Sequence, residues 1–406
     1  MVKYFYVCYQ KDCFRRGLDA GKMYYYLEAN GWKPVQDVSK ADLIIIYTCG
    51  GFNHTEYRCV KTIKRALDSK KVNTKVIVTG CLLKINPKSV GNFGEIEIVL
   101  DHDLYKLDDI IHSEKPYDEF PDPNIIPEKI KDIDDYSKIK KFIYRFSFEK
   151  NFVKYLLHLF YKKIKIKDRI ESSFEFNKDV FKIRISEGCL GKCTYCALKI
   201  AWGKLRSKPK ADIIEEFKKG LELGFERFEF VSLDMGCYGL DIRTNIVDLL
   251  EIIFKEKRRF RLIMNDLNIH WLIRDDNFLP LLAKNKKHIE HIRIPIQSGS
   301  DKILKLMNRP YTKSEIYTVM RQIFEIMPEV AINTHFIVGF PGESYEDFLE
   351  TEKLIDDFNF HMIDVFCYQD RPGVKSASLP NKLDKKAKIK RAQELAGKRK
   401  GVDILY

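Results

Sequence analysis

From residue 180 onward, short apolar runs alternate with amphipathic segments, and this alternation restricts the fold more than any other feature of the chain. Six runs have the length and composition of buried strands, and helical patterns separate them. The runs are VFKIRISEGC, RFEFVSLD, RFRLIMND, IEHIRIPIQSG, VAINTHFIVGFPG and MIDVFCYQ. Strands that alternate with helices form parallel sheets, so we expect a full or partial (β/α) barrel here.

The first hundred or so residues show the same alternation on a smaller scale. The sequence predicts strands in KYFYVCY, ADLIIIYTC and TKVIVTGC, and helices in GLDAGKMYYYLEANG and EYRCVKTIKRALDSKK. Gly31 is a candidate C-cap for the first helix. The continuous apolar run in ADLIIIYTC is typical of a parallel sheet that is buried on both faces. We therefore expect a small parallel α/β domain at the N-terminus, and the fold class is α/β.

Composition changes between these two regions and divides the chain into four parts. We expect the N-terminal domain in residues 1–112, the barrel in residues 179–375, and a basic C-terminal helix or tail in residues 376–406. Residues 113–178 begin as a proline-rich, acidic linker. They continue as a basic and aromatic insert whose spacing, over residues 138–169, suits an amphipathic helix. This helix could face a nucleic acid or a peptide, or pack on the rest of the protein with its lysines in solvent.

Composition also limits the class of protein. Hydrophobic residues make up 45% of the chain and charged residues 32%, which is typical of a globular protein. No apolar run reaches the length of a membrane span, and the first residues lack a signal-peptide pattern, so we expect a cytoplasmic protein without a membrane partner. The net charge of +13 fits a nucleic-acid partner, but a lysine-rich background would give the same value. Ten cysteines in such a chain favour metal or redox chemistry over disulfides.

Three of these cysteines follow the first predicted barrel strand. Cys189, Cys193 and Cys196 are spaced CxxxCxxC in ISEGCLGKCTYCALK. A zinc site normally needs four ligands, and no fourth Cys or His lies close by in sequence. An iron–sulfur cluster can use thiolates at short, uneven spacings. The odd number of thiols favours a [4Fe–4S] cluster in which one iron is left open for another ligand.

Three other cysteines lie at predicted strand ends in the N-terminal domain. Cys8 lies at or near the end of the first strand, and Cys49 and Cys81 end the next two buried strands. Ligands of parallel sheets collect outside the carboxyl ends of the strands, so these thiols should converge. The alternative is that all three are small buried hydrophobic residues. Cys59, inside a predicted helix, is expected to be structural, while the role of Cys13 stays open.

The CxxxCxxC motif after the first strand of a βα barrel resembles the radical S-adenosylmethionine (SAM) superfamily. Five segments, which also follow the family's order, are similar to the methylthiotransferase family: ISEGCLGKCTYC, SLDMGCYGLD, IRIPIQSGSDKILKLMNRPYT, THFIVGFPGESYEDFLET and QDRPGVKSASLP. The resemblance covers roughly residues 1–110 and 180–380. It implies an N-terminal domain followed by a radical SAM partial (β/α)6 barrel. GCLGKCTYC and DMGCYGLDIRTN are most similar to the branch that modifies threonylcarbamoyladenosine in tRNA.

The resemblance implies an enzyme with two [4Fe–4S] clusters and SAM. The CxxxCxxC thiols would hold the cluster at which SAM is cleaved to a radical. Cys8, Cys49 and Cys81 fall on the positions that hold an auxiliary cluster, where one iron stays open for the transferred sulfur. The implied reaction replaces C–H with C–S–CH3 on the substrate. A reductant such as flavodoxin or ferredoxin would supply the electron.

Seven residues are candidates for contacts with SAM. They lie in the cysteine motif, in strand-end loops or within a strand: Tyr195, Asp234, Tyr238, Arg293, Gln297, Ser298 and Gly339. Tyr195 could back onto the adenine, and Gln297 and Ser298 could form hydrogen bonds with SAM. Gly339 begins the glycine loop GFPGE, where the backbone can approach a ligand. The alternative for each residue is loop structure without contact.

Departures from the family concern the substrate. Members that act on tRNA or on a ribosomal protein usually end in a small β-barrel, the TRAM domain, which we expect this chain to lack. His335 lies where the family usually has an acidic residue. The first hypothesis is a peptide or protein substrate, such as a ribosomally made natural-product precursor. The second is a modified adenosine of tRNA, with residues 138–169 in place of the TRAM domain. The third is a cluster-bearing binding or sensor protein without turnover.

Overall fold

The computed structural model describes residues 2–11, 13–133, 179–398 and 401–405. The chain divides into two compact units, one within residues 1–176 and one within residues 177–406. Each unit has its own parallel sheet and its own buried core. The predicted basic helix of residues 138–169 lies outside the described residues. In the part that is described, no helix has the length and apolar character needed to cross a membrane.

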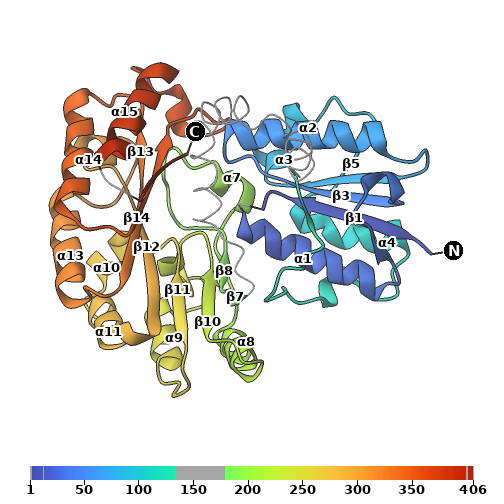
Figure 1. The fold of residues 1–406 in the computed structure, drawn as a ribbon, viewed down its shortest axis with the longest axis horizontal. Helices are drawn as coiled ribbons and strands as arrows, with labels where there is room; N and C mark the ends of the chain where they lie inside the picture. Colours follow the sequence, from blue (N-terminus) through green and yellow to red (C-terminus); the bar gives the residue numbers. More distant parts are fainter. Residues whose placement is uncertain (1, 12, 134–178, 399–400, 406) are drawn as a thin grey trace, which may run out of the picture. The chain divides into compact units, whose positions relative to one another are not determined.

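The first unit is a parallel sheet with a long helix on each face (Figure 1). Its strands are β1 (Tyr4–Tyr9), β2 (Lys33–Pro34), β3 (Leu43–Thr48), β4 (Lys75–Gly80), β5 (Glu97–Ile98) and β6 (Lys131–Asp132). Their order is β2-β1-β3-β4-β5, and β6 pairs with β1. Its helices are α1 (Phe14–Ala29), α2 (Asn53–Ser69), α3 (Leu82–Ile85) and α4 (Leu107–Ile111). The predicted small parallel α/β domain is confirmed.

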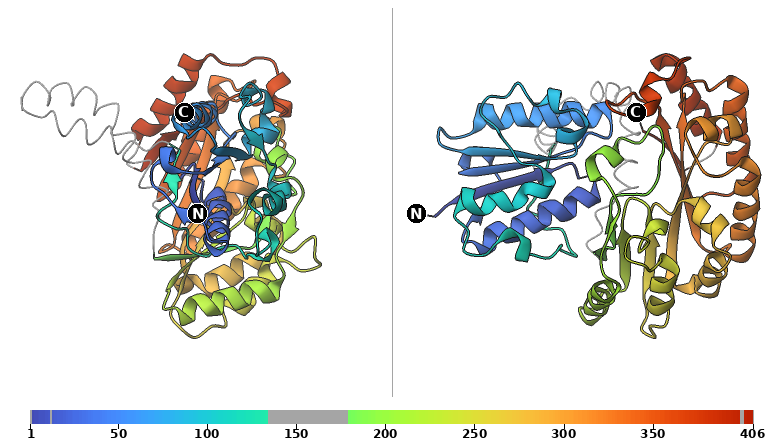
Figure 2. Two further views of the ribbon diagram at one scale, coloured as in Figure 1. Left: turned by 90° about the vertical axis from the view of Figure 1, so that its right-hand side faces the viewer. Right: turned by 180° about the vertical axis from the view of Figure 1, so that it is seen from behind.

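The sequence pattern explains why α1 and α2 cover opposite faces of this sheet (Figures 1 and 2). All residues of β3 are buried, as expected of a strand that is covered on both sides. The buried stripe of α2 consists of Cys59, Ile63 and Ala66, and it packs against Ile44 and Ile46 of β3. Alternate residues of the strands therefore face α2 and α1 in turn.

Residues 113–133 are part of the first unit, although their proline and acidic content had indicated a linker. β6 pairs in parallel with the end of β1, beside Cys8 and Tyr9. Apolar side chains of this stretch are buried, among them Tyr117, Ile126, Ile130 and Ile133. The burial of this apolar surface stabilises the packing of the segment against the first unit.

The second unit is a parallel sheet whose strands follow each other in chain order, β7-β10-β11-β12-β13-β14-β15. They are β7 (Val180–Arg184), β10 (Arg227–Val231), β11 (Arg261–Met264), β12 (Ile289–Gln297), β13 (Ala331–Val338), β14 (Met362–Cys367) and β15 (Val402–Leu405). A short antiparallel pair, β8 (Ser186–Glu187) and β9 (Arg206–Ser207), lies outside this sheet. The first six strands of the sheet are the six predicted ones, so the partial (β/α)6 barrel is confirmed.

Helices connect these strands, and the longer ones cover the outer face of the sheet (Figure 1). They are α7 (Leu198–Trp202), α8 (Lys210–Glu222), α9 (Ile246–Ile253), α10 (Ile269–Arg274), α11 (Phe278–Lys284), α12 (Asp301–Leu306), α13 (Lys313–Ile326), α14 (Tyr345–Asp357) and α15 (Lys385–Lys398). Capping boxes fix the start of two of them. Thr312 and Glu315 cap α13, and Ser344 and Asp347 cap α14, each pair satisfying backbone N–H groups.

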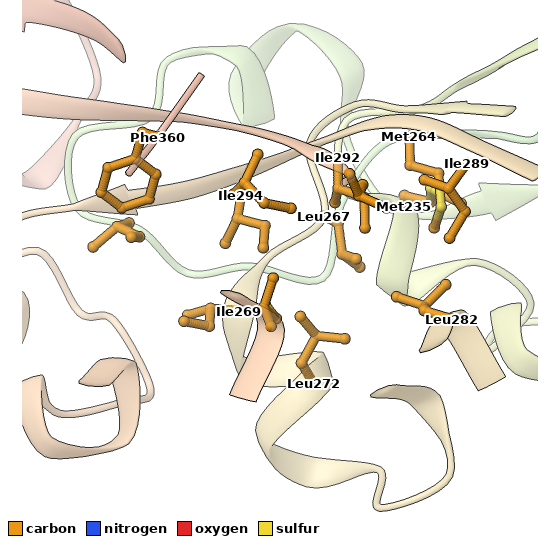
Figure 3. Packing of buried hydrophobic residues seen from close by; sticks show 14 of the residues in the cluster. Met235, Met264, Leu267, Ile269, Leu272, Leu282, Ile289, Ile292, Ile294 and Phe360 are labelled. Atoms are coloured by element: carbon orange, nitrogen blue, oxygen red, sulfur yellow. The ribbon is translucent and has the colours of Figure 1, made fainter. Parts of the chain in front are cut away.

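The core of the second unit lies between the sheet and these helices. Figure 3 shows Ile292 and Ile294 of β12 on one side of the core, and Ile269 and Leu272 of α10 on the other. Alternate residues of a strand point to opposite faces of the sheet. The remaining positions of β12, which include Arg293, therefore face the inner side of the partial barrel.

β15 was not predicted, because the sequence of residues 376–406 indicated only a basic helix or tail. α15 accounts for the helix, and the chain then returns as a strand that pairs with β14 from Ile363 to Phe366. Val402 and Ile404 are buried. Two alternating apolar residues are too weak a signal to mark a strand within a lysine-rich stretch.

Candidate functional site

The thiols of the CxxxCxxC motif lie in a loop beyond the carboxyl end of β7. The loop starts at Gly188, where φ is +71° and an added Cβ would lie 1.9 Å from a backbone oxygen, so a side chain does not fit. The loop then turns around Gly191, where a Cβ would lie 3.1 Å from Cys189 Sγ and 3.7 Å from Cys193 Sγ. Cys196 follows just before α7, and both other thiols affect its pKa. The two glycines allow the three sulfurs to gather.

Hydrogen-bond donors around this motif favour the thiolate form. A backbone N–H donates to Cys189 Sγ at 3.1 Å, and Arg309 Nη1 donates to Cys193 Sγ at 3.1 Å. The pKa of Cys189 is lowered, first by the hydrogen bond that it shares with the Cys237 thiol. Burial raises the pKa of Cys196 to about 11, although backbone N–H groups at the start of α7 oppose this effect. Donors of this kind are typical of cysteines that react or bind metal as thiolates.

Sequence reasoning missed Arg309. Its side chain is 9% exposed, and it also donates from Nε to the Tyr311 hydroxyl at 2.7 Å and from Nη2 to the Pro295 carbonyl at 3.4 Å. Arg309 lies 116 positions after Cys193, in the quoted segment IRIPIQSGSDKILKLMNRPYT. The segment marked a functional loop, but no local pattern pairs this arginine with the cysteine.

Asp234 lies in the loop after β10, beside the same thiols. Trp271 Nε1 donates to its carboxylate and lies 3.1 Å from each oxygen, and Oδ2 lies 4.0 Å from Cys189 Sγ. Burial raises the pKa of Asp234. Tyr238 in the same loop is buried, and its hydroxyl donates to the carbonyl of Lys208 at 3.0 Å. Asp234 thus approaches the thiols, while the Tyr238 hydroxyl binds the backbone.

Tyr195 and Gly339 lie near each other in the second unit. The Tyr195 ring meets the Phe340 ring edge-on, with 6.4 Å between the centroids. Gly339 has a φ of +70°, and its N–H donates to Glu343 Oε2 at 2.7 Å. A Cβ at this glycine would lie 2.4 Å from Lys388 Cγ of α15. The glycine loop is therefore packed against α15.

Gln297, Arg293 and His335 lie at neighbouring positions on the inner side of the partial barrel. Gln297 has a φ of +77°, which is uncommon for a residue other than glycine. Its Nε2 lies 2.7 Å from His335 Nε2, and Arg293 Nη2 lies 3.8 Å from Asp364 Oδ2. Burial holds the pKa of His335 at about 4, so the ring is neutral and accepts the amide N–H of Gln297. These side chains can hold a polar ligand.

Ser298 faces α14 rather than these side chains. Its Oγ lies 3.4 Å from Thr351 Oγ1 and accepts the N–H of Ser300 at 3.2 Å. The next residue, Gly299, approaches α14 so closely that a Cβ would lie 2.4 Å from the Glu350 carbonyl oxygen. This segment therefore joins the end of β12 to α14.

In the first unit, the thiols of Cys13, Cys49 and Cys81 affect the pKa values of one another. Burial, followed by the Cys49 and Cys8 thiols, also raises the pKa of Cys59. Burial, followed by the Cys49 thiol, raises the pKa of Cys13 to about 11. Burial, followed by the Cys81 thiol, raises the pKa of Cys49. Burial also raises the pKa of Cys81 to about 11, and Cys13 contributes in the same direction. Cys49 and Cys81 directly follow β3 and β4, and Cys13 lies between β1 and α1, so the three thiols lie at the carboxyl edge of the sheet.

The structure does not bring Cys8 into this group. Cys8 is still within β1, paired with Ile46, and its fully buried side chain packs in the cluster beneath α2 that contains Cys59. Burial and then the Asp132 carboxylate raise its pKa. Cys13 instead lies beyond the strand, directly before α1. One thiol is a core residue of the strand, and the other lies at the edge.

Two matches cover most of the two units. Residues 183–355 match the radical SAM superfamily, and residues 12–101 match uncharacterized protein family UPF0004. The chain is 28% identical over 382 residues to the threonylcarbamoyladenosine tRNA methylthiotransferase MtaB of Thermotoga maritima, covering 94% of this chain and 78% of that protein. It is 30% identical over 400 residues to the ribosomal protein uS12 methylthiotransferase RimO of Clostridium tetani, covering 97% of this chain and 81% of that protein. The chain belongs to the methylthiotransferase family.

This methylthiotransferase is a radical SAM enzyme, and its cofactors are SAM and [4Fe–4S] clusters. Its fold is similar to the radical SAM methyltransferase TsrM of Kitasatospora setae, with a TM-score of 0.60, 12% identity, and coverage of 93% of this chain and 77% of that one. The UPF0004 match begins at residue 12, so it contains Cys13, Cys49 and Cys81 and leaves Cys8 out.

Both thiol groups of the methylthiotransferase fit a cluster better than a single metal ion. Among the described residues, no three Cys, His, Asp or Glu side chains converge tightly enough to bind one ion. A cubane cluster spaces its thiolates more widely than a tetrahedral zinc ion does. The cationic and N–H donors near these thiols suit the negative charge of such a cluster.

Proposed function

We propose that this radical SAM methylthiotransferase modifies an adenosine of tRNA. The first hypothesis from the sequence was a peptide or protein substrate, because no TRAM domain was expected. The relatives include both kinds, since MtaB is named for tRNA and RimO for a ribosomal protein. Because these names do not decide the substrate, the proposal rests on the surface of the first unit.

The observation that carries the proposal is an exposed aromatic and basic face on α2. Tyr57 is 67% exposed, and Lys61 Nζ lies 6.0 Å from the centre of its ring. Lys64 and Arg65 lie exposed on the next turn. We call these four residues the α2 face. Aromatic rings beside cations suit the stacking of unpaired bases and the binding of phosphates. The face begins shortly after Cys49, in the same unit as the gathered thiols.

We assign the radical-generating cluster to Cys189, Cys193 and Cys196. When bound, this cluster supplies the electron that cleaves SAM. The chain holds the three thiolates, and Arg309 Nη1 donates a hydrogen bond to Cys193 Sγ at 3.1 Å, which orients this sulfur. Asp234 lies beside Cys189, where its carboxylate can orient the polar end of SAM.

We assign the auxiliary cluster to Cys13, Cys49 and Cys81, so that Cys13 takes the place first given to Cys8. The backbone N–H of Arg16 favours the ionised form of Cys13, and the N-terminus of α1 favours negative charge there. By family resemblance, this cluster carries the sulfur that is transferred. The thiols must hold it while leaving one iron accessible.

The inner face of the partial barrel would hold the polar groups of SAM and the substrate. Arg293, Gln297 and the neutral His335 offer donors and acceptors there. Contacts of SAM with Tyr195, Tyr238, Ser298 and Gly339 stay predictions. A flavodoxin-like or ferredoxin-like reductant and a cytoplasmic location also stay predictions.

The chemical identity of the methylthio product shows which substrate the enzyme modifies. Reconstituted, reduced enzyme incubated with SAM and total tRNA is expected to yield a methylthio-adenosine after digestion of the RNA, detected by mass spectrometry. The C13A variant serves as the control and should yield none. If SAM is cleaved to 5′-deoxyadenosine but only an added peptide or protein gains the methylthio group, the tRNA proposal is wrong and the peptide hypothesis holds.

Removing the positive charges of the α2 face is expected to weaken tRNA binding. The variant K61A/K64A/R65A loses up to three phosphate contacts, so the slope of log K against log salt should fall by about 3. Fluorescence anisotropy with labelled tRNA over a range of salt concentrations measures this slope. The control K218A/K219A/K255A removes the same charge from exposed positions of the second unit and should leave the slope unchanged. Equal slopes for the two variants would rule out the α2 face as the docking surface.

A further inference from the structure

Arg16 is a buried arginine that points at one of the gathered thiols of the first unit. It lies on the first turn of α1, and its side chain is 2% exposed. Nη2 lies 3.1 Å from Cys81 Sγ and Nε lies 3.3 Å from it, so two donors of one guanidinium meet one sulfur. Sequence reasoning gave no role to this residue, because 65 positions separate it from Cys81.

Two carboxylates hold this guanidinium in place. Nη1 donates to Asp19 Oδ2 at 2.7 Å, and Nη2 donates to Asp101 Oδ2 at 2.8 Å. Asp101 is itself fixed by the Thr79 hydroxyl, which donates to Oδ1 at 3.3 Å. An arginine is costly to bury unless its donors are satisfied and its charge is matched. Here one carboxylate on each side of the guanidinium fixes its orientation toward the sulfur.

We propose that Arg16 is a positioning residue that fixes the Cys81 thiolate and raises the reduction potential of the auxiliary cluster. This role rests on the proposed function of Cys13, Cys49 and Cys81 as the ligands of that cluster. Reduction adds one negative charge to a cluster whose thiolates are already negative. A nearby cation and hydrogen bonds to the sulfur stabilise the reduced state more than the oxidised one. Electrons therefore enter the cluster more readily when Arg16 is present.

The same geometry gives Asp101 the opposite effect. Its carboxylate offsets part of the guanidinium charge and lies at the edge of the same thiol group. In the D101N variant the amide keeps the size of the side chain and loses the negative charge. The cluster then experiences more of the positive charge of Arg16, so its potential should rise. Removing the charge of Arg16 should lower it.

The test isolates the auxiliary cluster in the full-length chain. In the C189A/C193A/C196A background, the reconstituted protein should hold one cluster. A redox titration followed by electron paramagnetic resonance then gives the ratio of reduced to oxidised cluster at each potential. The R16Q substitution is expected to lower this ratio at least tenfold at a fixed potential, a shift of about 59 mV for a one-electron couple. The D101N substitution should move the ratio upward.

The control is K75Q, which removes a positive charge from an exposed position at the amino end of β4 in the same unit and should leave the ratio unchanged. If the background protein holds no iron, the assignment of the auxiliary cluster is wrong, and the role of Arg16 fails with it. If it holds iron but D101N fails to raise the potential, the role of Arg16 alone is overturned. D101N decides this point even if R16Q does not retain the cluster. A purely structural role would reduce iron loading in both variants without shifts of opposite sign.

Discussion

Replacing Cys189, Cys193 and Cys196 together by alanine is expected to halve the iron of the reconstituted enzyme and to abolish SAM cleavage. The wild-type chain should hold about eight irons, four for each [4Fe–4S] cluster, and the triple variant about four. Without these thiolates no cluster can bind and reduce SAM, so 5′-deoxyadenosine should fall to the background level. Colorimetric iron assays and liquid chromatography with mass spectrometry measure the two quantities.

The matched control for this experiment is another cysteine of the second unit. Cys367 lies at the end of β14, and its thiol lies 3.6 Å from the Lys388 carbonyl oxygen, to which it donates. C367A should keep about eight irons and cleave SAM normally. If the triple variant retains all its iron, the CxxxCxxC thiols do not hold a cluster, and the whole assignment of the second unit is wrong.

The C13A and C8A variants are expected to behave in opposite ways. C13A should lose about four irons and form no methylthio product, because one of the three gathered thiolates is gone. It should still cleave SAM, since the second unit is unchanged. C8A should keep about eight irons, because its thiol packs in the core beneath α2 rather than at the edge of the sheet. Iron content and product formation are measured side by side.

This pair also tests the sequence-based assignment directly. If C8A loses the auxiliary iron and C13A keeps it, the original choice of Cys8 was correct, and the thiol group described in the structure does not hold the cluster. The two variants remove the same atoms and lie five positions apart in one unit. A difference in iron content between the two variants is therefore due to the position of the thiol, because both variants lose one cysteine.

Much of the fold was accessible from hydrophobic patterns. The fully buried β3 and the six βα repeats of the barrel were predicted, because each produces a strong local signal over several residues. β15 and the strand β6 were not predicted. They are short and form only because a neighbouring strand presents a free edge, so their stability comes from pairing rather than from their own sequence.

The sequence does not contain the geometry that distinguishes the position of Cys8 from that of Cys13. A cysteine near a strand end can face either side of the sheet, and a shift of one residue reverses its direction. The pairing of Cys8 with Ile46 directs it toward α2. Arg16 and Arg309 were missed for a related reason. Each meets a cysteine that is distant in sequence, and only the folded chain brings them together.

The short strand β15 also affects how this protein behaves in a crowded solution. An open sheet ends in unpaired N–H and C=O groups, and such edges promote association between chains. Without β15, the six-residue β14 would present this edge. The outermost strand of the described sheet has four residues and follows a lysine-rich helix, α15. A short edge beside many like charges is a poor template for another strand, so the return of the chain to the sheet protects against aggregation.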